Sequence, residues 1–215
     1  MTPQEFIARY PTLYHMAEQG SWESIRKVGL RSTSALLDLY EVTGLKRQAI
    51  ESEHRSASVY LSHSRYGVAV VRDQKPMSDS KLRSCLIDME PREWYELLNQ
   101  KVFFWPTAER LIGLLSARSY RKNPHVVIGV DTSVLLDQYL GQTTLSPINS
   151  GSTFYTPVPR GRETFVPLAD YPADWWRARR ISEVAVDYAI PNIADIVTSI
   201  EEWEGSSKLQ TIWQR

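Results

Sequence analysis

Apolar and polar residues alternate along the chain in short blocks, each long enough for one helix or one strand. Blocks with a polar first residue and apolar residues three or four apart predict helices over 2–9, 21–28, 33–58, 91–98, 108–118, 132–138 and 193–203. Short apolar and β-branched runs predict strands over 13–16, 30–32, 59–61, 82–89, 102–105, 126–130 and 184–186. Residues 141–180 are rich in Thr, Ser, Pro and Gly and predict a long functional or disordered loop. Short strands interleaved with helices favour an α+β fold.

Composition narrows the class of protein. The chain has 215 residues, 42% hydrophobic and 23% charged, which fits a single domain over 1–215 and excludes general disorder. No apolar run approaches the ~18 residues of a membrane span, and the N-terminus lacks a signal-peptide pattern. Cys85 is the single cysteine, so an internal disulfide is excluded and we expect a cytoplasmic protein in which Cys85 is a buried, inert thiol on a strand.

Charge and aromatic content bear on possible partners. The 25 basic and 25 acidic residues cancel, so a nucleic acid must be held by local basic clusters rather than by a general field. The candidate nucleic-acid-binding residues are Arg118, Arg121, Lys122, Arg160, Arg162, Arg177 and Arg179. Ordinary solvated surface is the alternative explanation. Among the eleven Tyr residues, Tyr14, Tyr60 and Tyr155 are candidates for stacking on a ring, with core packing or simple surface exposure as the alternative.

Common catalytic signatures are missing from the sequence. It contains no phosphate-binding GxxxxGK[ST] loop, no GxGxxG after a strand, no HExxH and no GxSxG. The four His residues have no metal-ligand spacing, so we expect no metal site. Three other segments occur in a fixed order and remain to be explained: LYHM at 13–16, then GL at 29–30; VFFWP at 102–106, then Arg110; and RRISEVAV at 179–186, then IP at 190–191.

In this order the three segments resemble the ADP-ribosyltransferases, in particular DarT-type toxins that modify bases in DNA. That family has a hydrophobic-Tyr-His strand before a helix ending in Gly-Leu, a Pro-Phe-Tyr-Phe strand leading to an Arg, and a late segment that carries the catalytic Glu and precedes Val-Pro. The matched segments lie near both ends of the chain. Ala17 stands where the family commonly has Thr, and about 70 residues separate Leu30 from the second segment, which predicts an insertion over 33–95.

The resemblance implies a fold and a set of roles. The fold would be ADP-ribosyltransferase-like, with small mixed sheets around a cleft and peripheral helices. NAD would be the substrate, with no metal, and the partner a nucleic acid, with DNA carrying a flipped-out or single-stranded base expected. Glu183 and His15 would be catalytic, and Tyr14, His15, Met16 and Arg110 would bind NAD. The biological role would be that of a toxin or a phage-defence effector.

Chemistry supports Glu183 without the family name. Cleavage of an N-glycosidic bond passes through an oxocarbenium-like sugar, which a nearby carboxylate stabilises. Glu183 begins a predicted strand beside the long loop, with Ala185 and Asp187 on the same face. The alternative is a surface glutamate paired with Arg179 or Arg180.

The other candidates also have two interpretations. His15 can hydrogen-bond a ribose hydroxyl or a phosphate, or it can be a core histidine satisfied by a backbone carbonyl. Arg110 can bind a phosphate or simply lie at the surface. We expect residues 149–152 and 160–162 of the long loop to recognise the acceptor, because glycines allow close backbone approach and arginines contact phosphates.

Three functions therefore stay open. The first is an NAD-dependent ADP-ribosyltransferase acting on a base in nucleic acid, and the second is a DNA glycosylase on the same scaffold, in which water replaces the acceptor. The absent Thr at position 17 favours the glycosylase. The third is a non-catalytic binding module, in which Glu183 would be ion-paired and far from any cleft. For either enzyme, we expect strands 13–16, 102–105 and 183–187 to form one sheet region, so that His15 and Glu183 line a shared cleft.

Overall fold

The computed structural model describes residues 1–154, 157–178 and 180–215 of the chain. Its helices are α1 (Pro3–Arg9), α2 (Trp22–Val28), α3 (Thr33–Leu39), α4 (Gly44–Glu51), α5 (Asp79–Cys85), α6 (Pro91–Asn99), α7 (Ala108–Leu115), α8 (Thr132–Tyr139), α9 (Ala173–Arg177) and α10 (Ile193–Ile196). Its strands are β1 (Thr12–Glu18), β2 (Leu30–Arg31), β3 (Val59–His63), β4 (Gly67–Val71), β5 (Lys101–Phe104), β6 (Pro124–Asp131), β7 (Thr143–Ser146), β8 (Val166–Pro167), β9 (Glu183–Asp187), β10 (Ala189–Ile190), β11 (Val197–Glu204) and β12 (Ser207–Gln214).

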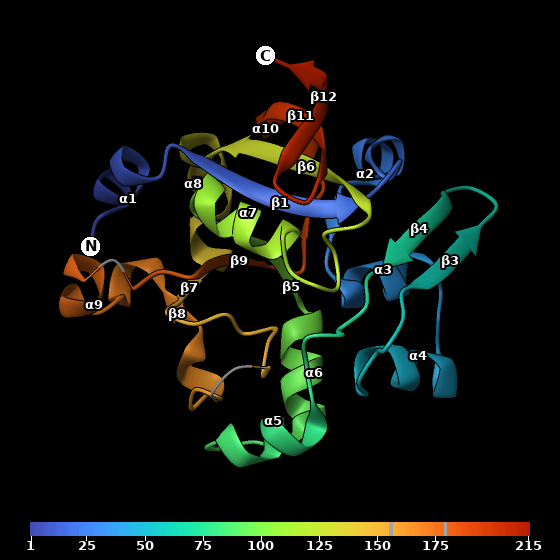
Figure 1. The fold of residues 1–215 in the computed structure, drawn as a ribbon, viewed down its shortest axis with the longest axis horizontal. Helices are drawn as coiled ribbons and strands as arrows, with labels where there is room; N and C mark the ends of the chain where they lie inside the picture. The colour runs from blue at the N-terminus through green and yellow to red at the C-terminus, as the bar shows by residue number, and fades with distance from the viewer. Residues whose placement is uncertain (155–156, 179) are drawn as a thin grey trace.

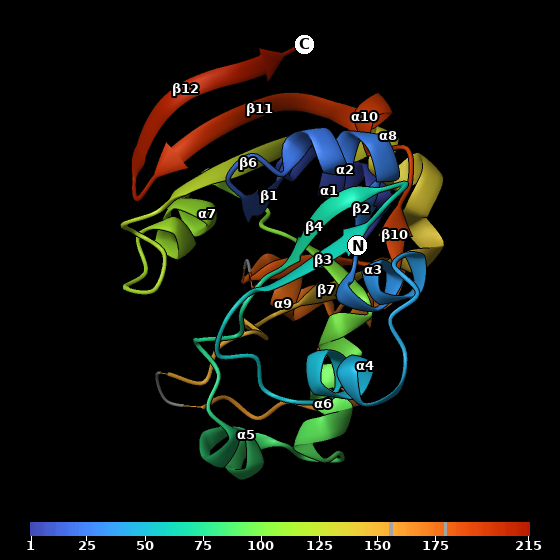
Figure 2. The same cartoon turned by 90° about the vertical axis from the view of Figure 1, so that its right-hand side faces the viewer.

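Two four-stranded antiparallel sheets organise the molecule. One has the strand order β1-β6-β11-β12 and the other β5-β9-β7-β8, and two-stranded ladders pair β10 with β2 and β3 with β4. The β11–β12 hairpin extends from the body at one end, while α5 and α6 lie at the other (Figures 1 and 2). This mixture of helices and small antiparallel sheets confirms the predicted α+β class.

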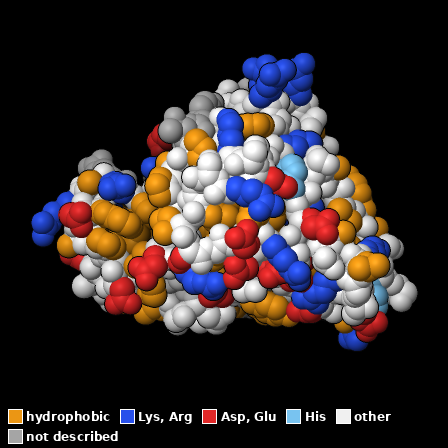
Figure 3. Space-filling view, turned by 90° about the horizontal axis from the view of Figure 1, so that it is seen from below, with side chains coloured by type: hydrophobic (Ala, Val, Ile, Leu, Met, Phe, Trp, Pro, Cys, Tyr) orange, Lys and Arg blue, Asp and Glu red, His pale blue; other side chains and the backbone are white. Residues whose placement is uncertain are grey.

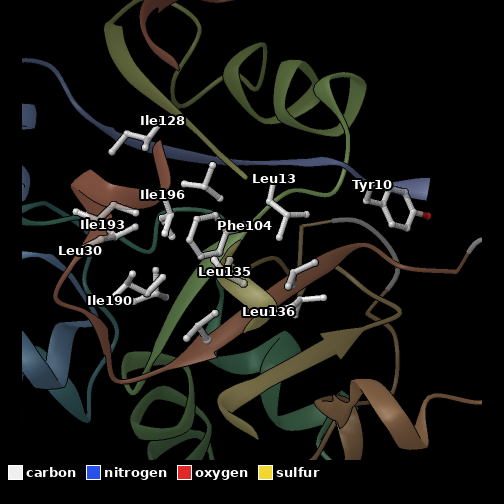
Figure 4. Close-up of a cluster of buried hydrophobic side chains, with 14 of the residues drawn as sticks. Tyr10, Leu13, Leu30, Phe104, Ile128, Leu135, Leu136, Ile190, Ile193 and Ile196 are labelled. Carbon is white, nitrogen blue, oxygen red and sulfur yellow. The ribbon is translucent and has the colours of Figure 1, made fainter. Parts of the chain in front are cut away.

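The main hydrophobic core lies between the two sheets (Figure 4). Strand β1 contributes Leu13 and β6 contributes Ile128 from the first sheet, while β5 contributes Phe104 from the second. Helices α8 and α10 complete the core with Leu135 and Ile196, among others. All these side chains are fully buried, and each stabilises the fold by roughly 1.5–3 kcal/mol relative to an exposed position.

An isolated β-bridge outside the regular ladders joins the two sheets. Tyr14 N donates to Trp105 O at 3.0 Å, and Trp105 N donates to Tyr14 O at 2.8 Å. Strand β5 in turn pairs with β9, with Phe104 opposite Val184. The three strands that were expected to share one sheet region are therefore connected, although β1 belongs to one sheet and β5 and β9 to the other.

The predicted insertion over 33–95 forms much of the lower and right-hand part of Figure 1. Helices α3 and α4 and the β3–β4 hairpin bury a core of their own, with Leu37, Ile50, Leu61 and Val71 at its centre. Helices α5 and α6 bury a second small core around Trp94. The first of these cores consists of residues of the insertion alone, whereas the second also includes Phe165, Ala185 of β9 and Phe103 of β5, so that α5 and α6 pack onto the second sheet.

Several local predictions hold. Helix α1 begins near its predicted start with a capping box, because the Thr2 side chain accepts from Glu5 N and the Glu5 carboxylate accepts from Thr2 N. Gly29 ends α2 with a positive φ of 86°, and Thr107 caps α7 by accepting from Arg110 N. Ser21 precedes α2, but its hydroxyl donates to Glu18 O instead of capping the helix.

Other predictions were wrong in the type of element. The segment 82–89 is not a strand: Leu82 and Cys85 lie on helix α5 at a spacing of three, which places both on its buried side. Cys85 is buried as expected, and its thiol donates to Leu82 O. The predicted helix over 33–58 is interrupted after Leu39, where Glu41 has a positive φ of 55°, and continues as α4 and an irregular stretch.

The segments 193–203 and 141–180 also differ from their predicted structures. The segment 193–203 is helical only over α10 and continues as strand β11, because Val197 and Ile200 pair with β6. Its buried residues recur at helical intervals, yet the open edge of β6 determines the outcome. The segment 141–180 contains β7, β8 and α9 within its described residues; Leu145 and the small hydroxyls of Thr143 and Ser146 are buried.

Gly29 offers a test of how closely the end of α2 packs against Pro191. A Cβ at this position would lie 2.6 Å from Pro191 Cα, and its φ of +86° disfavours side chains. We expect Gly29→Ala to lower the free energy of unfolding by roughly 2 kcal/mol or more. Gly113→Ala is the control, because Gly113 lies on α7 with open space around it. Urea unfolding should show Gly113→Ala unchanged or stabilised by about 0.5–1 kcal/mol; equal losses in both variants would contradict the prediction.

Candidate active site

A pocket of about 1210 Å³ opens between β1, α2, the β3–β4 hairpin, α7 and the start of β9. Its wall includes His15 from β1, Glu183 from β9 and the backbone of residues 149–152. The structure thus brings together two candidate catalytic residues that are far apart in the sequence. It also places the Asn149–Ser152 part of the predicted recognition loop in the same pocket.

Glu183 is buried at the first position of β9, with 4% of its surface exposed. Its Oε2 accepts from Ser150 N at 3.1 Å. Burial raises the pKa of the Glu183 carboxyl from 4.5 to about 7, while the Ser150 hydrogen bonds and the positive charges of Arg160 and Arg110 lower it in part. Among the described residues the carboxylate has no salt-bridge partner, and Arg180 lies over the Trp175 ring instead. A carboxylate of this kind is half ionised near neutral pH.

The loop before Glu183 is fixed by a buried arginine. Arg160 has 3% of its surface exposed, and its Nη1 donates to Ser150 O and Ser152 O, both at 3.0 Å. Its guanidinium also lies over the Trp94 ring. The prediction that Arg160 binds a nucleic-acid phosphate was therefore wrong, because the side chain is consumed by backbone carbonyls. It positions the Ser150 amide that faces Glu183.

His15 lies on β1, partly buried, with Nδ1 2.8 Å from Phe103 O. Because a carbonyl only accepts, Nδ1 carries the proton and Nε2 is left as an acceptor. Burial, together with the nearby positive charge of Arg72, lowers the pKa of His15 from 6.5 to about 4, although the Phe103 hydrogen bond acts in the opposite direction. The ring is neutral above that pH. His15 is thus satisfied by a backbone carbonyl, as one interpretation expected, and it also lines the pocket; its contact with a ribose or a phosphate stays a prediction.

The remaining NAD-binding candidates divide into two groups. Met16 and Arg110 line the pocket, and Arg110 Nη1 donates to Ser182 Oγ at 3.3 Å, one residue before Glu183. Tyr14 packs with residues of α7 in an apolar cluster that also includes Met16. Tyr14 and Met16 are two residues apart on β1 and share one side of the strand, whereas His15 faces the other side.

The described basic candidates differ in their surroundings. Arg118 is exposed and lines the pocket, whereas Arg121 and Lys122 are exposed in the turn after α7. Arg162 pairs with Glu93 at 2.8 Å, and Arg177 is exposed at the end of α9. The residues Arg179 and Tyr155 lie outside the described part of the chain. On the face seen from below, basic and acidic side chains are interspersed (Figure 3), as expected for a chain without net charge.

Two features of the site were missed from the sequence, namely the position of Arg72 in the pocket and the structural role of Arg160. Ser150, by contrast, lies in the predicted 149–152 stretch; it is 1% exposed, and its backbone N donates to Glu183. Arg72, just after β4, lines the pocket near His15. No local pattern marks Arg72 or the role of Arg160 in fixing the loop, because each acquires its role only when distant segments meet.

The described residues limit what else the site can hold. Within them, no three His, Cys, Asp or Glu side chains gather in a way that suits a metal ion. Every described helix is too short or too polar to traverse a lipid bilayer.

The fold and the pocket define an α+β protein in which a buried carboxylate and a neutral histidine share one large pocket. The chain belongs to a family of unknown function, DUF7002, whose model matches residues 11–197. This range includes β1, β5 and β9, and therefore the whole of the candidate site. No curated protein matches the chain.

The raised pKa of Glu183 has a measurable consequence for stability. Between pH 4.5 and 7 the folded protein binds more protons at this residue than the unfolded chain, so its contribution to stability falls as the pH rises. As the pH rises through this window, we expect the free energy of unfolding of Glu183→Gln to increase relative to that of the wild type by up to about 3 kcal/mol. Chemical unfolding at pH 5 and pH 8 tests this; a constant difference between the two proteins would indicate an ordinary carboxyl. His15 gives stability the opposite dependence on pH, but both proteins contain His15, so its contribution cancels in the difference between them.

Proposed function

We propose that this protein cleaves an N-glycosidic bond on an ADP-ribosyltransferase-like fold, and that it transfers ADP-ribose from NAD to a base in nucleic acid. The observation that carries the proposal is the meeting of Glu183 and His15 in one pocket, from strands that occur in the order of the DarT-type segments. A toxin or phage-defence role in the cytoplasm follows from the same resemblance. The non-catalytic alternative required an ion-paired Glu183 remote from any cleft, and its placement in the pocket argues against that alternative.

Glu183 has the properties that the chemistry needs. When the C–N bond of the ribose breaks, the electron pair leaves with nicotinamide and positive charge develops on the sugar. An ionised Glu183 stabilises this charge, and its effect is large because the carboxylate is removed from water. The acceptor nitrogen then attacks the anomeric carbon, and its proton passes to a base. The protonated and ionised forms of Glu183 are both accessible near pH 7, which suits it to receive that proton.

The other pocket residues suit the substrate's polar groups. Neutral His15 presents Nε2 as an acceptor for a ribose hydroxyl, since Nδ1 is committed to Phe103 O. Arg110 is held by Ser182 Oγ beside the carboxylate and supplies positive charge for a phosphate. The pocket volume of about 1210 Å³ is sufficient for a dinucleotide together with part of an acceptor.

A DNA glycosylase is the second candidate. Water in place of the acceptor would make the same carboxylate hydrolyse a base from DNA. The specific observation in its favour is Ala17, which lines the pocket where the resembled family commonly supplies a Thr hydroxyl. The two reactions release different products, so one assay separates them.

The central test is incubation with NAD, single-stranded DNA, or both, followed by mass spectrometry. The transferase releases nicotinamide and adds ADP-ribose to DNA, whereas the glycosylase releases a free base without NAD. We expect Glu183→Gln to reduce either rate by about 10²–10³-fold, because it removes the charge and keeps the size. Glu163→Gln, at an exposed position outside the pocket, is the matched control. Wild-type turnover by Glu183→Gln would remove Glu183 from the mechanism, and absence of both products would refute the proposal.

The pH profile gives an independent check on the ionised form. If Glu183 acts as a carboxylate, kcat/KM should rise about tenfold per pH unit below its pKa and level off above about 7. His15 stays neutral over the same range because its pKa is about 4. A profile that is flat from pH 5 to 8 would show that a group other than Glu183 controls the rate.

A further inference from the structure

The β3–β4 hairpin has one buried side and one side toward the pocket. Leu61, Ala69 and Val71 are buried in the small core of the insertion, and Ala69 and Val71 also border the pocket. Strand alternation directs Tyr60 and Val70, which are directly opposite each other in the ladder, to the other side, and both line the pocket. The insertion therefore contributes part of the pocket wall.

Tyr60 is unusually open for an aromatic residue in a pocket. Its exposed fraction is 65%, and that of Val68 on the same side of the hairpin is 56%. Neither side chain contributes to the buried clusters of the described residues. Because exposed aromatic surface stabilises nothing in the free protein, a ring stacked on Tyr60 would remove apolar surface from water.

Arg72 continues the same side of the hairpin toward His15. It follows Val70 by two positions, lines the pocket and lies over Tyr120, with its guanidinium carbon 5.0 Å from the ring centroid. Its Nη1 is buried and has no hydrogen-bond partner among the described residues. A buried donor of a charged group that lacks a partner is costly, and an anion in the pocket would offset that cost.

Neighbouring charged groups are already engaged. Lys101 pairs with Asp187, and Arg55 donates to Arg72 O and Asn99 Oδ1. Asp73, the nearest carboxylate in sequence, accepts from Tyr120 and pairs with Lys75 at 3.3 Å. Arg72 is thus a cation that lines the pocket, and its guanidinium still has a hydrogen-bond donor available for an anion.

We infer that this side of the hairpin is a nucleotide subsite, in which Arg72 binds a phosphate and Tyr60 stacks on the attached base. The inference rests on the proposed function for the kind of substrate, and it assigns the predicted insertion a role in recognition. The same chemistry is found in one half of a dinucleotide and in a nucleotide of single-stranded DNA. Binding at the subsite does not require bond cleavage, so it can be tested separately from activity.

Calorimetric titration of the full chain with AMP and with adenosine tests the two contacts individually. We expect Arg72→Gln to weaken AMP binding about tenfold and to leave adenosine binding unchanged, because only AMP carries a phosphate. Tyr60→Ala should weaken both ligands about tenfold, and Tyr60→Trp should restore them. Arg72→Lys should retain part of the AMP affinity, since it keeps the charge but loses the planar fork.

Matched controls are available outside the pocket. Arg83→Gln and Leu45→Ala change exposed side chains of similar kinds and should leave both affinities unchanged. Thermal melts establish that each variant is folded. An equal loss of AMP and adenosine binding in Arg72→Gln would assign Arg72 a structural role and overturn the inference. Failure of wild type to bind AMP at millimolar concentration, or unchanged affinities in Tyr60→Ala, would also overturn it.

Two further ligands identify the source of the nucleotide. If the nucleotide belongs to a dinucleotide, Arg72→Gln weakens the binding of ADP-ribose and leaves the affinity for a six-nucleotide single-stranded DNA unchanged. If the nucleotide belongs to DNA, Arg72→Gln weakens the binding of the oligonucleotide, and the magnitude of the slope of log K against log salt falls by about one. Either pattern supports the subsite, whereas no change with either ligand contradicts it. The wild-type protein could bind these ligands, and lose affinity in the variants as expected, yet release neither nicotinamide nor base. That result would refute the proposed function and still support the subsite.

Discussion

Two backbone hydrogen bonds between Tyr14 and Trp105 connect the sheets on which the molecule is built. They hold β1 against the end of β5, and the adjacent Phe103 carbonyl then receives the proton of His15 Nδ1. Strand β5 aligns β9 in turn, which places Glu183 at the edge of the same opening. The relative position of the two ionisable side chains is therefore determined by main-chain pairing rather than by flexible side chains, which suits a site that must fix charge in space.

The insertion between β2 and β5 adds to this frame without rebuilding it. Helices α3 and α4 and the hairpin have an apolar core of their own, whereas α5 and α6 share theirs with Ala185 of β9 and Phe103 of β5. The insertion also forms a wall of the pocket and contacts the loop that reaches Glu183, since Thr153 N donates to Pro76 O and Ser78 N to Thr153 Oγ1. This arrangement lets the segment change the shape of the pocket while the strands that carry His15 and Glu183 stay in place.

What the sequence predicts depends on the range of the interactions involved. The cap of α1, the end of α2 at Gly29 and the strand around Val184 follow from a few neighbouring residues, and all were predicted correctly. The segment from Ile193 to Trp203 was not, because its apolar spacing is compatible with a helix and only the free edge of β6 selects the strand. His15 and Glu183 were found through their local motifs. The buried role of Arg160 was not, since the carbonyls it binds belong to a loop whose path no local pattern specifies.

The acidity of Glu183 illustrates how a residue's chemistry can belong to a different part of the chain. Strand β9 supplies the carboxylate, but the loop held by Arg160 excludes water from it and provides the Ser150 amide. A transplant of the strands alone into another scaffold would therefore carry a glutamate of ordinary acidity. An engineered version of this site would need to preserve the Arg160 guanidinium and the Ser150 amide as carefully as the carboxylate itself.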